Sequence, residues 1–125
     1  MTALHASREL AVSVAEKLKL YAQPQRLMIL SCLLAGERNV AAIGAATGIG
    51  QPALSQQLAE LRRAGLVAHR REAREIRYTL ADEGVASCVR TMEAVFGSNI
   101  PGTSASAPVP PRAAAPGIAH FAQTP

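Results

Sequence analysis

Apolar and polar positions between residues 48 and 66 recur at the spacing of a helix with two different faces. Leu54, Leu58 and Leu61 fall at i, i+4 and i+7, which places all three on one apolar stripe. The other face carries glutamine, serine and arginine. Glycines precede this segment, and Gly65 suits a left-handed cap at its end. The pattern predicts a tight turn followed by a helix that is buried on one side and exposed on the other.

Three amphipathic helices are predicted ahead of this segment, over residues 7–21, 24–35 and 40–47. Pro24 fits the first turn of the second helix, where a backbone N–H has no partner in any case. Asn39 is suited to cap the third helix. The residues expected on their inward faces are Leu10, Val14, Leu18, Tyr21, Leu27, Leu30, Leu34, Ile43 and Ala46.

Two short strands and one more helix are predicted after Gly65. Residues 66–71 and 75–80 alternate around a polar tip, which is typical of a β-hairpin. Asp82 caps a final helix whose apolar surface exceeds what the small core can cover, so we expect the first and last helices to form a dimer interface. The fold class is therefore mainly α with a small β-hairpin, in the order of a winged helix–turn–helix.

The composition changes beyond the final helix. Residues 99–125 hold six of the eight prolines and a single charged residue, Arg112. Such a segment buries too little apolar surface to offset the entropy of ordering it. We expect one folded domain over residues 1–98, whose DNA-binding side chains are considered next and whose first and last helices serve dimerisation, and a Pro/Ala-rich flexible tail over residues 99–125.

The polar face of the predicted helix, which is not part of the leucine stripe, carries side chains suited to recognising bases. Gln51, Ser55 and Gln56 are expected to face base edges, since glutamine forms a bidentate pair with adenine in the major groove. Pro52 is placed for an apolar contact with a thymine methyl group. Gln57 lies nearer the packed side and is given a supporting role. The alternative is an ordinary solvent-facing helix surface.

Net charge is a modest +4, but six of the 13 basic residues fall within 16 positions. On its own such a cluster is equally typical of a solvated face. Because this cluster follows the predicted helix directly, we expect its arginines to contact the phosphates or an adjacent minor groove of duplex DNA. Arg77 has the further alternative of pairing with Glu75 or Glu83. The expected contact residues are Arg62 and Arg63 near the helix end and Arg70, Arg71, Arg74 and Arg77 on the hairpin.

The order of elements and four segments resemble the ArsR/SmtB family of bacterial repressors, closest to its NolR/BigR/HlyU-like branch. The segments are Gln23-Pro-Gln-Arg-Leu-Met-Ile-Leu30, residues 48–58, Leu61-Arg-Arg-Ala-Gly-Leu-Val67 and Arg70-Arg-Glu-Ala-Arg-Glu-Ile-Arg-Tyr78. The resemblance implies a homodimeric transcriptional repressor whose two recognition helices enter successive major grooves of a pseudo-palindromic operator, usually near its own promoter.

The resemblance also implies where metal ligands would lie. Metal-sensing members carry cysteines in the third helix, or Asp and His in the final helix. Here residues 40–47 contain no ligand, and the final helix has no histidine. His5, His69 and His120 show no metal-ligand spacing. We expect no metal site and no cofactor, and the sequence identifies no small-molecule inducer.

Cys32 and Cys88 are the two cysteines, and we interpret both as small buried hydrophobic residues. The alternative is a repressor that responds to oxidant or sulfide through one or both thiols. Thiol-responsive members of the family place cysteines where Ser31 and Gly97 stand here. Relative to those positions, Cys32 is rotated by about 100° around its helix and Cys88 is displaced by about 13 Å along its helix. The resemblance therefore does not extend to that switch.

Two other functional classes are weighed against a DNA-binding regulator. A winged-helix module that grips an acidic protein would use the same arginine surface. An enzyme is not supported, because there is no glycine-rich phosphate loop and no activating base beside Ser55. The N-terminal segment lacks the pattern of a signal peptide or a membrane span, so we expect no membrane partner and a cytoplasmic location.

Overall fold

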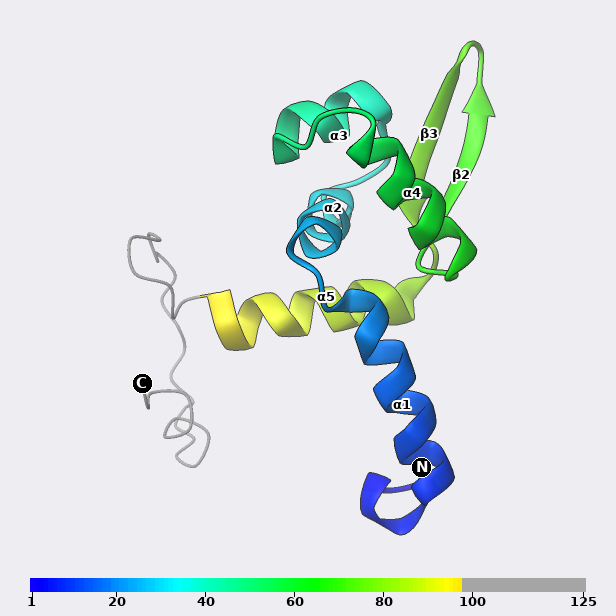
Figure 1. Cartoon of the computed structure of the whole chain (residues 1–125), viewed down its shortest axis with the longest axis vertical. Helices are drawn as coiled ribbons and strands as arrows, with labels where there is room; N and C mark the ends of the chain where they lie inside the picture. Colours follow the sequence, from blue (N-terminus) through cyan, green and yellow to red (C-terminus); the bar gives the residue numbers. More distant parts are fainter. Residues whose placement is uncertain (98–125) are drawn as a thin grey trace. The chain divides into compact units, whose positions relative to one another are not determined.

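The computed structural model describes residues 1–97, and the tail predicted over residues 99–125 lies outside the described residues. The fold is mainly helical with a small antiparallel sheet, as predicted (Figure 1). Met1–Ala86 form one compact unit, and a second begins at Ser87, within the last helix. The elements in chain order are η1 (Leu4–Ala6), α1 (Arg8–Tyr21), α2 (Pro24–Leu34), β1 (Arg38–Asn39), α3 (Val40–Thr47), α4 (Ala53–Arg63), β2 (Val67–Glu72), β3 (Glu75–Leu80) and α5 (Glu83–Phe96).

Polar side chains set the starts of three helices. Ser7 Oγ accepts a hydrogen bond from the backbone N–H of Leu10 at 3.0 Å and so caps α1. Asn39 Oδ1 accepts from Ala42 at 2.8 Å at the start of α3, and Asp82 Oδ1 accepts from Val85 at 3.0 Å ahead of α5. Each cap satisfies a backbone donor that the first helical turn leaves unpaired. The predicted caps at Asn39 and Asp82 are confirmed.

The leucine stripe of α4 is the centre of the core. Leu54, Leu58 and Leu61 are 2%, 1% and 0% exposed, as the spacing predicts. They share the core with Ile29 and Leu30 of α2 and with Ile43 of α3, and α2 contacts both α3 and α4. Burying a side chain of this size contributes about 1.5–3 kcal/mol. Hydrophobic burial therefore fixes which face of α4 stays exposed.

The inward faces of the other helices differ in part from the prediction. Leu30 is buried, but Ile29 and Leu33 are its buried neighbours, whereas Leu27 and Leu34 are half-buried. The reason is that α2 contacts α3, α4 and β3, so more than one side of it is covered. Ala46 of α3 and Leu18 of α1 are exposed rather than buried; for Leu18 the reason is that α1 has its main contacts with η1.

The sheet has three antiparallel strands in the order β1-β3-β2. The predicted hairpin is confirmed as β2 and β3, and Ala73 adopts a left-handed backbone, with φ of 59°, in the tight turn between them. β1 was not predicted, because two residues show no alternation that a sequence pattern could detect. Through β1 the sheet joins the start of α3, since Asn39 both pairs with Arg77 and caps that helix.

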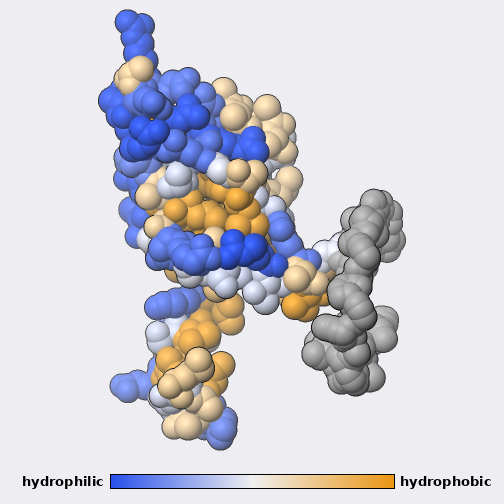
Figure 2. Space-filling view, turned by 180° about the vertical axis from the view of Figure 1, so that it is seen from behind, coloured by the Kyte–Doolittle hydropathy of each residue, from blue (hydrophilic) through white to orange (hydrophobic). Residues whose placement is uncertain are grey.

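Large apolar side chains are exposed on the first and last helical segments. They are Leu4, Val12 and Leu18 in η1 and α1, and Val95 and Phe96 at the end of α5. Figure 2 shows hydrophobic surface along the protruding α1, interleaved with hydrophilic residues. In the part of the chain that the structure covers, no helix combines the length and the apolar composition that a bilayer crossing needs.

Candidate nucleic-acid interface

The polar face of α4 is exposed to solvent. Gln56 lies on it, on the other side of the helix from Leu54 and Leu58, and Ser55 is exposed at the edge of the leucine stripe. Gln51 and Pro52 are also exposed, in the turn that leads into α4. The four residues predicted to contact bases therefore form one accessible segment.

Gln51 has a structural role that the sequence did not reveal. Pro52 occupies the N-cap position of α4 and makes no side-chain capping hydrogen bond. Instead, the side-chain oxygen of Gln51 accepts a hydrogen bond from the backbone N–H of Ser55 at 3.1 Å. This contact satisfies one of the unpaired donors of the first turn. Gln51 therefore orders the start of the helix on which Ser55 and Gln56 lie.

Gln57 is half-buried and contacts residues of the α2 region, in agreement with its predicted place nearer the packed side of the helix. Its side-chain oxygen accepts a hydrogen bond from Arg26 Nε at 2.9 Å, and its Nε2 donates to Gln23 Oε1 at 3.2 Å. The Arg26 guanidinium also bonds Glu60 of α4 at 2.6 Å and the Leu20 carbonyl at 3.1 Å. Polar contacts thus attach α4 to α2 beside the leucine stripe. Sequence reasoning missed Arg26, although a charged residue within an apolar helix was a detectable signal.

Four of the predicted arginines are exposed cations. Arg62 and Arg63 lie in the last turn of α4, where positive charge is favourable for the helix dipole. Arg71 and Arg74 lie on and at the tip of the β2–β3 hairpin, the wing. Among residues 1–97 none of these four side chains forms an ion pair. Their charges are therefore available to an anionic partner.

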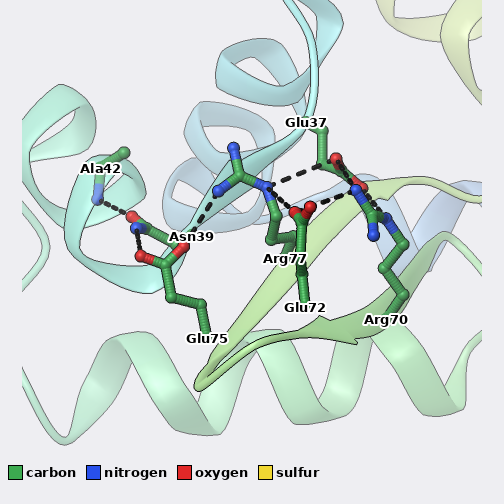
Figure 3. Close-up of polar contacts among 7 residues, drawn as sticks. All are labelled: Glu37, Asn39, Ala42, Arg70, Glu72, Glu75 and Arg77. Carbon is green, nitrogen blue, oxygen red and sulfur yellow. Dashed lines mark hydrogen bonds and ion pairs between the residues drawn. The ribbon is translucent and has the colours of Figure 1, made fainter.

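Arg70 and Arg77 differ from those four because acidic residues surround them (Figure 3). Arg70 forms a two-point contact with Glu37, through Nε to Oε2 at 2.7 Å and Nη2 to Oε1 at 2.8 Å. Arg77 Nε lies 3.4 Å from Glu37 Oε1, and Arg77 Nη1 lies 3.0 Å from Glu75 Oε1. Glu72 contacts Arg70 at 3.2 Å and Arg77 at 3.6 Å. The pairing of Arg77 with Glu75 is the alternative that the sequence left open.

Glu37 is the residue that links both arginines. Hydrogen bonds from Arg70 hold the pKa of Glu37 below its ordinary value of 4.5; partial burial opposes this shift, and the charges of Arg70 and Arg77 support it. The same contact raises the pKa of Arg70. Glu37 lies in the connection between α2 and β1, so its ion pairs attach the wing to the helical part of the domain.

The two cysteines are free thiols. Cys32 on α2 is half-buried, and Cys88 on α5 is exposed, so the interpretation of both as buried hydrophobic residues is wrong for Cys88. That interpretation took burial as the usual state of a free cysteine, but the buried residues of this part of α5 are Val85, Ala86 and Val89, and Cys88 lies outside that stripe. Within residues 1–97 no three His, Cys, Asp or Glu side chains are grouped so that they could hold a metal ion.

The fold and the exposed polar helix define a winged helix–turn–helix protein. Residues 23–69 match the arsR family of bacterial regulatory proteins. The biofilm growth-associated repressor of Agrobacterium fabrum is 44% identical over 93 residues, which cover 74% of this chain and 80% of that protein. The chain therefore belongs to the arsR family, within its BigR-, NolR- and HlyU-like branch.

Solved structures agree with this assignment. The transcriptional repressor BigR from Xylella fastidiosa has a TM-score of 0.70 and 37% identity, over 76% of this chain and 97% of that one. The homodimeric winged helix-turn-helix DNA-binding domain Mb0332 from Mycobacterium bovis has a TM-score of 0.64 and 35% identity, over 79% and 90%. The protein is a DNA-binding transcriptional regulator, and its family is not one of enzymes.

Proposed function

We propose that this protein represses transcription as a homodimer bound to a pseudo-palindromic operator, and that it acts in the bacterial cytoplasm. The observation that carries the proposal is that α4 has two different sides: its leucines are buried, and Ser55 and Gln56 remain exposed. The relatives named as repressors support the direction of regulation. A small dimer on a promoter represses by blocking access to the DNA.

Base recognition is assigned to the exposed residues of α4 and of the turn before it. Gln56 is the main candidate for a bidentate pair with adenine, and Ser55 contributes a further hydrogen bond. Pro52 offers an apolar contact to a thymine methyl group. Gln51 already uses its side-chain oxygen to cap α4, so its amide N–H groups are the part that serves DNA.

Phosphate contacts are assigned first to the four unpaired arginines, Arg62, Arg63, Arg71 and Arg74. Each neutralised phosphate releases condensed counterions, so binding must weaken steeply as salt rises. Arg70 and Arg77 remain candidates by position, but their guanidiniums are engaged by carboxylates in the free protein.

Dimerisation is assigned to α1 and α5. Leu18 on α1 is 57% exposed and Phe96 on α5 is 60% exposed, and an isolated domain gains nothing from leaving such side chains in water. The Mycobacterium bovis relative is described as homodimeric. Two copies related by a two-fold axis would bring two recognition helices to two half-sites one helical turn apart.

Mobility shift with the intergenic duplex upstream of the gene tests this function. The wild-type protein should form a complex that a shuffled duplex of equal composition does not form and that added salt dissociates. Equal binding to both duplexes would contradict operator recognition. Absence of any complex would favour the rival function of a protein-binding module.

Sedimentation velocity tests the dimer separately. Leu18→Asp should shift the protein towards monomer, because it places a charge on the apolar surface of α1. Lys19→Asp, a neighbouring change on the same helix at a residue that is 74% exposed, serves as the control. If both variants sediment as the wild type does, α1 is not the dimer interface.

A further inference from the structure

The pairing of β2 with β3 places like charges opposite each other. Arg70 is the cross-strand partner of Arg77, and Glu72 is the cross-strand partner of Glu75. Like charges directly opposite in a sheet are destabilising. All four residues lie on one face of the hairpin, because side chains alternate between faces along a strand. Glu72 already lies 3.2 Å from Arg70 and 3.6 Å from Arg77, and Glu37, from outside the hairpin, adds a second carboxylate that hydrogen-bonds both arginines.

The same cluster reaches the helix–turn–helix. Asn39 Nδ2 donates a hydrogen bond to Glu75 Oε2 at 3.0 Å, while Asn39 Oδ1 caps α3. Glu37 and Asn39 both belong to the short segment between α2 and α3. The wing is therefore attached through charged and polar side chains to the start of α3, the helix that precedes α4 (Figure 3).

The other two arginines of the wing lie outside this cluster. Arg71 pairs across the strands with Ile76, on the opposite face of the hairpin, and Arg74 lies in the turn after Ala73. Both are exposed. The four wing arginines thus divide into a pair held by carboxylates and a pair with free charge.

We propose that Glu37 is a positioning residue for DNA binding: it neutralises Arg70 and Arg77 and holds the wing so that Arg71 and Arg74 meet the phosphates. This inference rests on the proposed function. It assigns the wing's DNA-binding charge to two arginines instead of four. Simple charge counting predicts that an acidic residue near DNA weakens binding. In this proposal Glu37 strengthens binding instead.

Whether Glu37→Gln weakens or strengthens DNA binding separates this proposal from simple charge counting. Glu37→Gln removes a negative charge, so electrostatics alone predicts tighter binding to any duplex. Loss of the ion pairs predicts weaker binding, because the wing is no longer held. Glu16→Gln on α1 makes the same change in net charge at a residue that is 67% exposed and distant in sequence from the wing. We expect Glu37→Gln to bind several-fold more weakly than Glu16→Gln.

A double-mutant cycle with Arg70 completes the test. Affinities of the full chain for a fluorescent mixed-sequence duplex are measured for wild type, Glu37→Gln, Arg70→Gln and the double variant. If Arg70 acts through Glu37, the Arg70→Gln change costs less affinity once Glu37 is gone. If Arg70 contacts phosphate, it costs more in that background, since the freed guanidinium would bind DNA fully.

The outcomes are distinct. Tighter binding by Glu37→Gln, or a larger effect of Arg70→Gln in its background, overturns the inference and leaves the proposed function intact. Failure of the wild type to bind any duplex rejects the proposed function itself, and this inference with it. Should Glu37→Gln not fold, Glu37→Asp keeps the charge while shortening the side chain. It should weaken binding in the same direction, and unchanged binding would count against Glu37.

Discussion

Arg26 of α2 and Glu60 of α4 form an ion pair of 2.6 Å that joins α2 to the proposed recognition helix. The Arg26 side chain is 13% exposed, and its remaining donors reach Gln57 of α4 and the Leu20 carbonyl at the end of α1. This one side chain of α2 therefore contacts two other helices, α1 and α4. Since α1 is the proposed dimer helix, Arg26 connects the surface that would meet the second subunit with the helix that would meet DNA.

Arg26→Ala should lower the free energy of unfolding by about 2 kcal/mol, because charge-assisted hydrogen bonds are lost and partly buried acceptors remain unpaired. Urea denaturation monitored by circular dichroism measures the change. Lys19→Ala, which removes an exposed pair of 3.9 Å with Glu16, should cost less than about 0.5 kcal/mol. Equal effects of the two substitutions would show that Arg26 is no more than a surface residue.

Gln56→Ala should relax base specificity at one position in each half-site, at a cost of about 1–3 kcal/mol for the preferred operator. The physical reason is the loss of a bidentate contact with a base edge. Competition binding against a panel of operators, each with one base pair changed, is the measurement. A uniform loss across the panel would assign Gln56 to the phosphate backbone or to folding. Gln57→Ala, which alters a residue turned towards α2, is the matched control and should leave the pattern of base preference unchanged.

The lowered pKa of Glu37 makes one part of the stability depend on pH. A carboxyl group whose pKa falls on folding stabilises the native state above its ordinary pKa and loses that contribution as pH falls through the lowered value. The difference in unfolding free energy between wild type and Glu37→Gln should therefore be full at neutral pH and shrink as pH falls below 4.5. Arg70 stays charged throughout this range, since its pKa is raised. Urea unfolding at a series of pH values gives the curve, and a difference that does not vary with pH would contradict it.

The double variant Cys32→Ser, Cys88→Ser should bind and release DNA as the wild type does, with affinity within about 0.5 kcal/mol. Serine is close to cysteine in size, and neither thiol forms a disulfide. The measurement is operator affinity before and after treatment with hydrogen peroxide or polysulfide. A response in the wild type that the variant lacks would establish the alternative function of a thiol-responsive repressor, with exposed Cys88 as the first residue to examine singly.

Local signals in the sequence were sufficient for the elements that carry the candidate interface. The Leu54–Leu58–Leu61 spacing predicted both the helix and its buried side, and therefore its exposed side as well. The caps at Asn39 and Asp82 were predictable because a cap and its backbone partner lie three residues apart. A capping side chain bonds a backbone group only a few residues away, so this contact can form whatever the fold of the distant parts of the chain.

The sequence by itself determined a winged helix–turn–helix with a polar recognition face, because periodicity and capping act over a few residues. Only the tertiary structure decided which arginines are free. Glu37 and Arg70 are 33 residues apart, and Arg26 and Glu60 are 34 residues apart. Six arginines look alike as a run of charge. Within residues 1–97, folding brings the Glu37 carboxylate to two of them and no acidic ion-pair partner to the other four, since the position of Glu37 depends on how β1 pairs with β3.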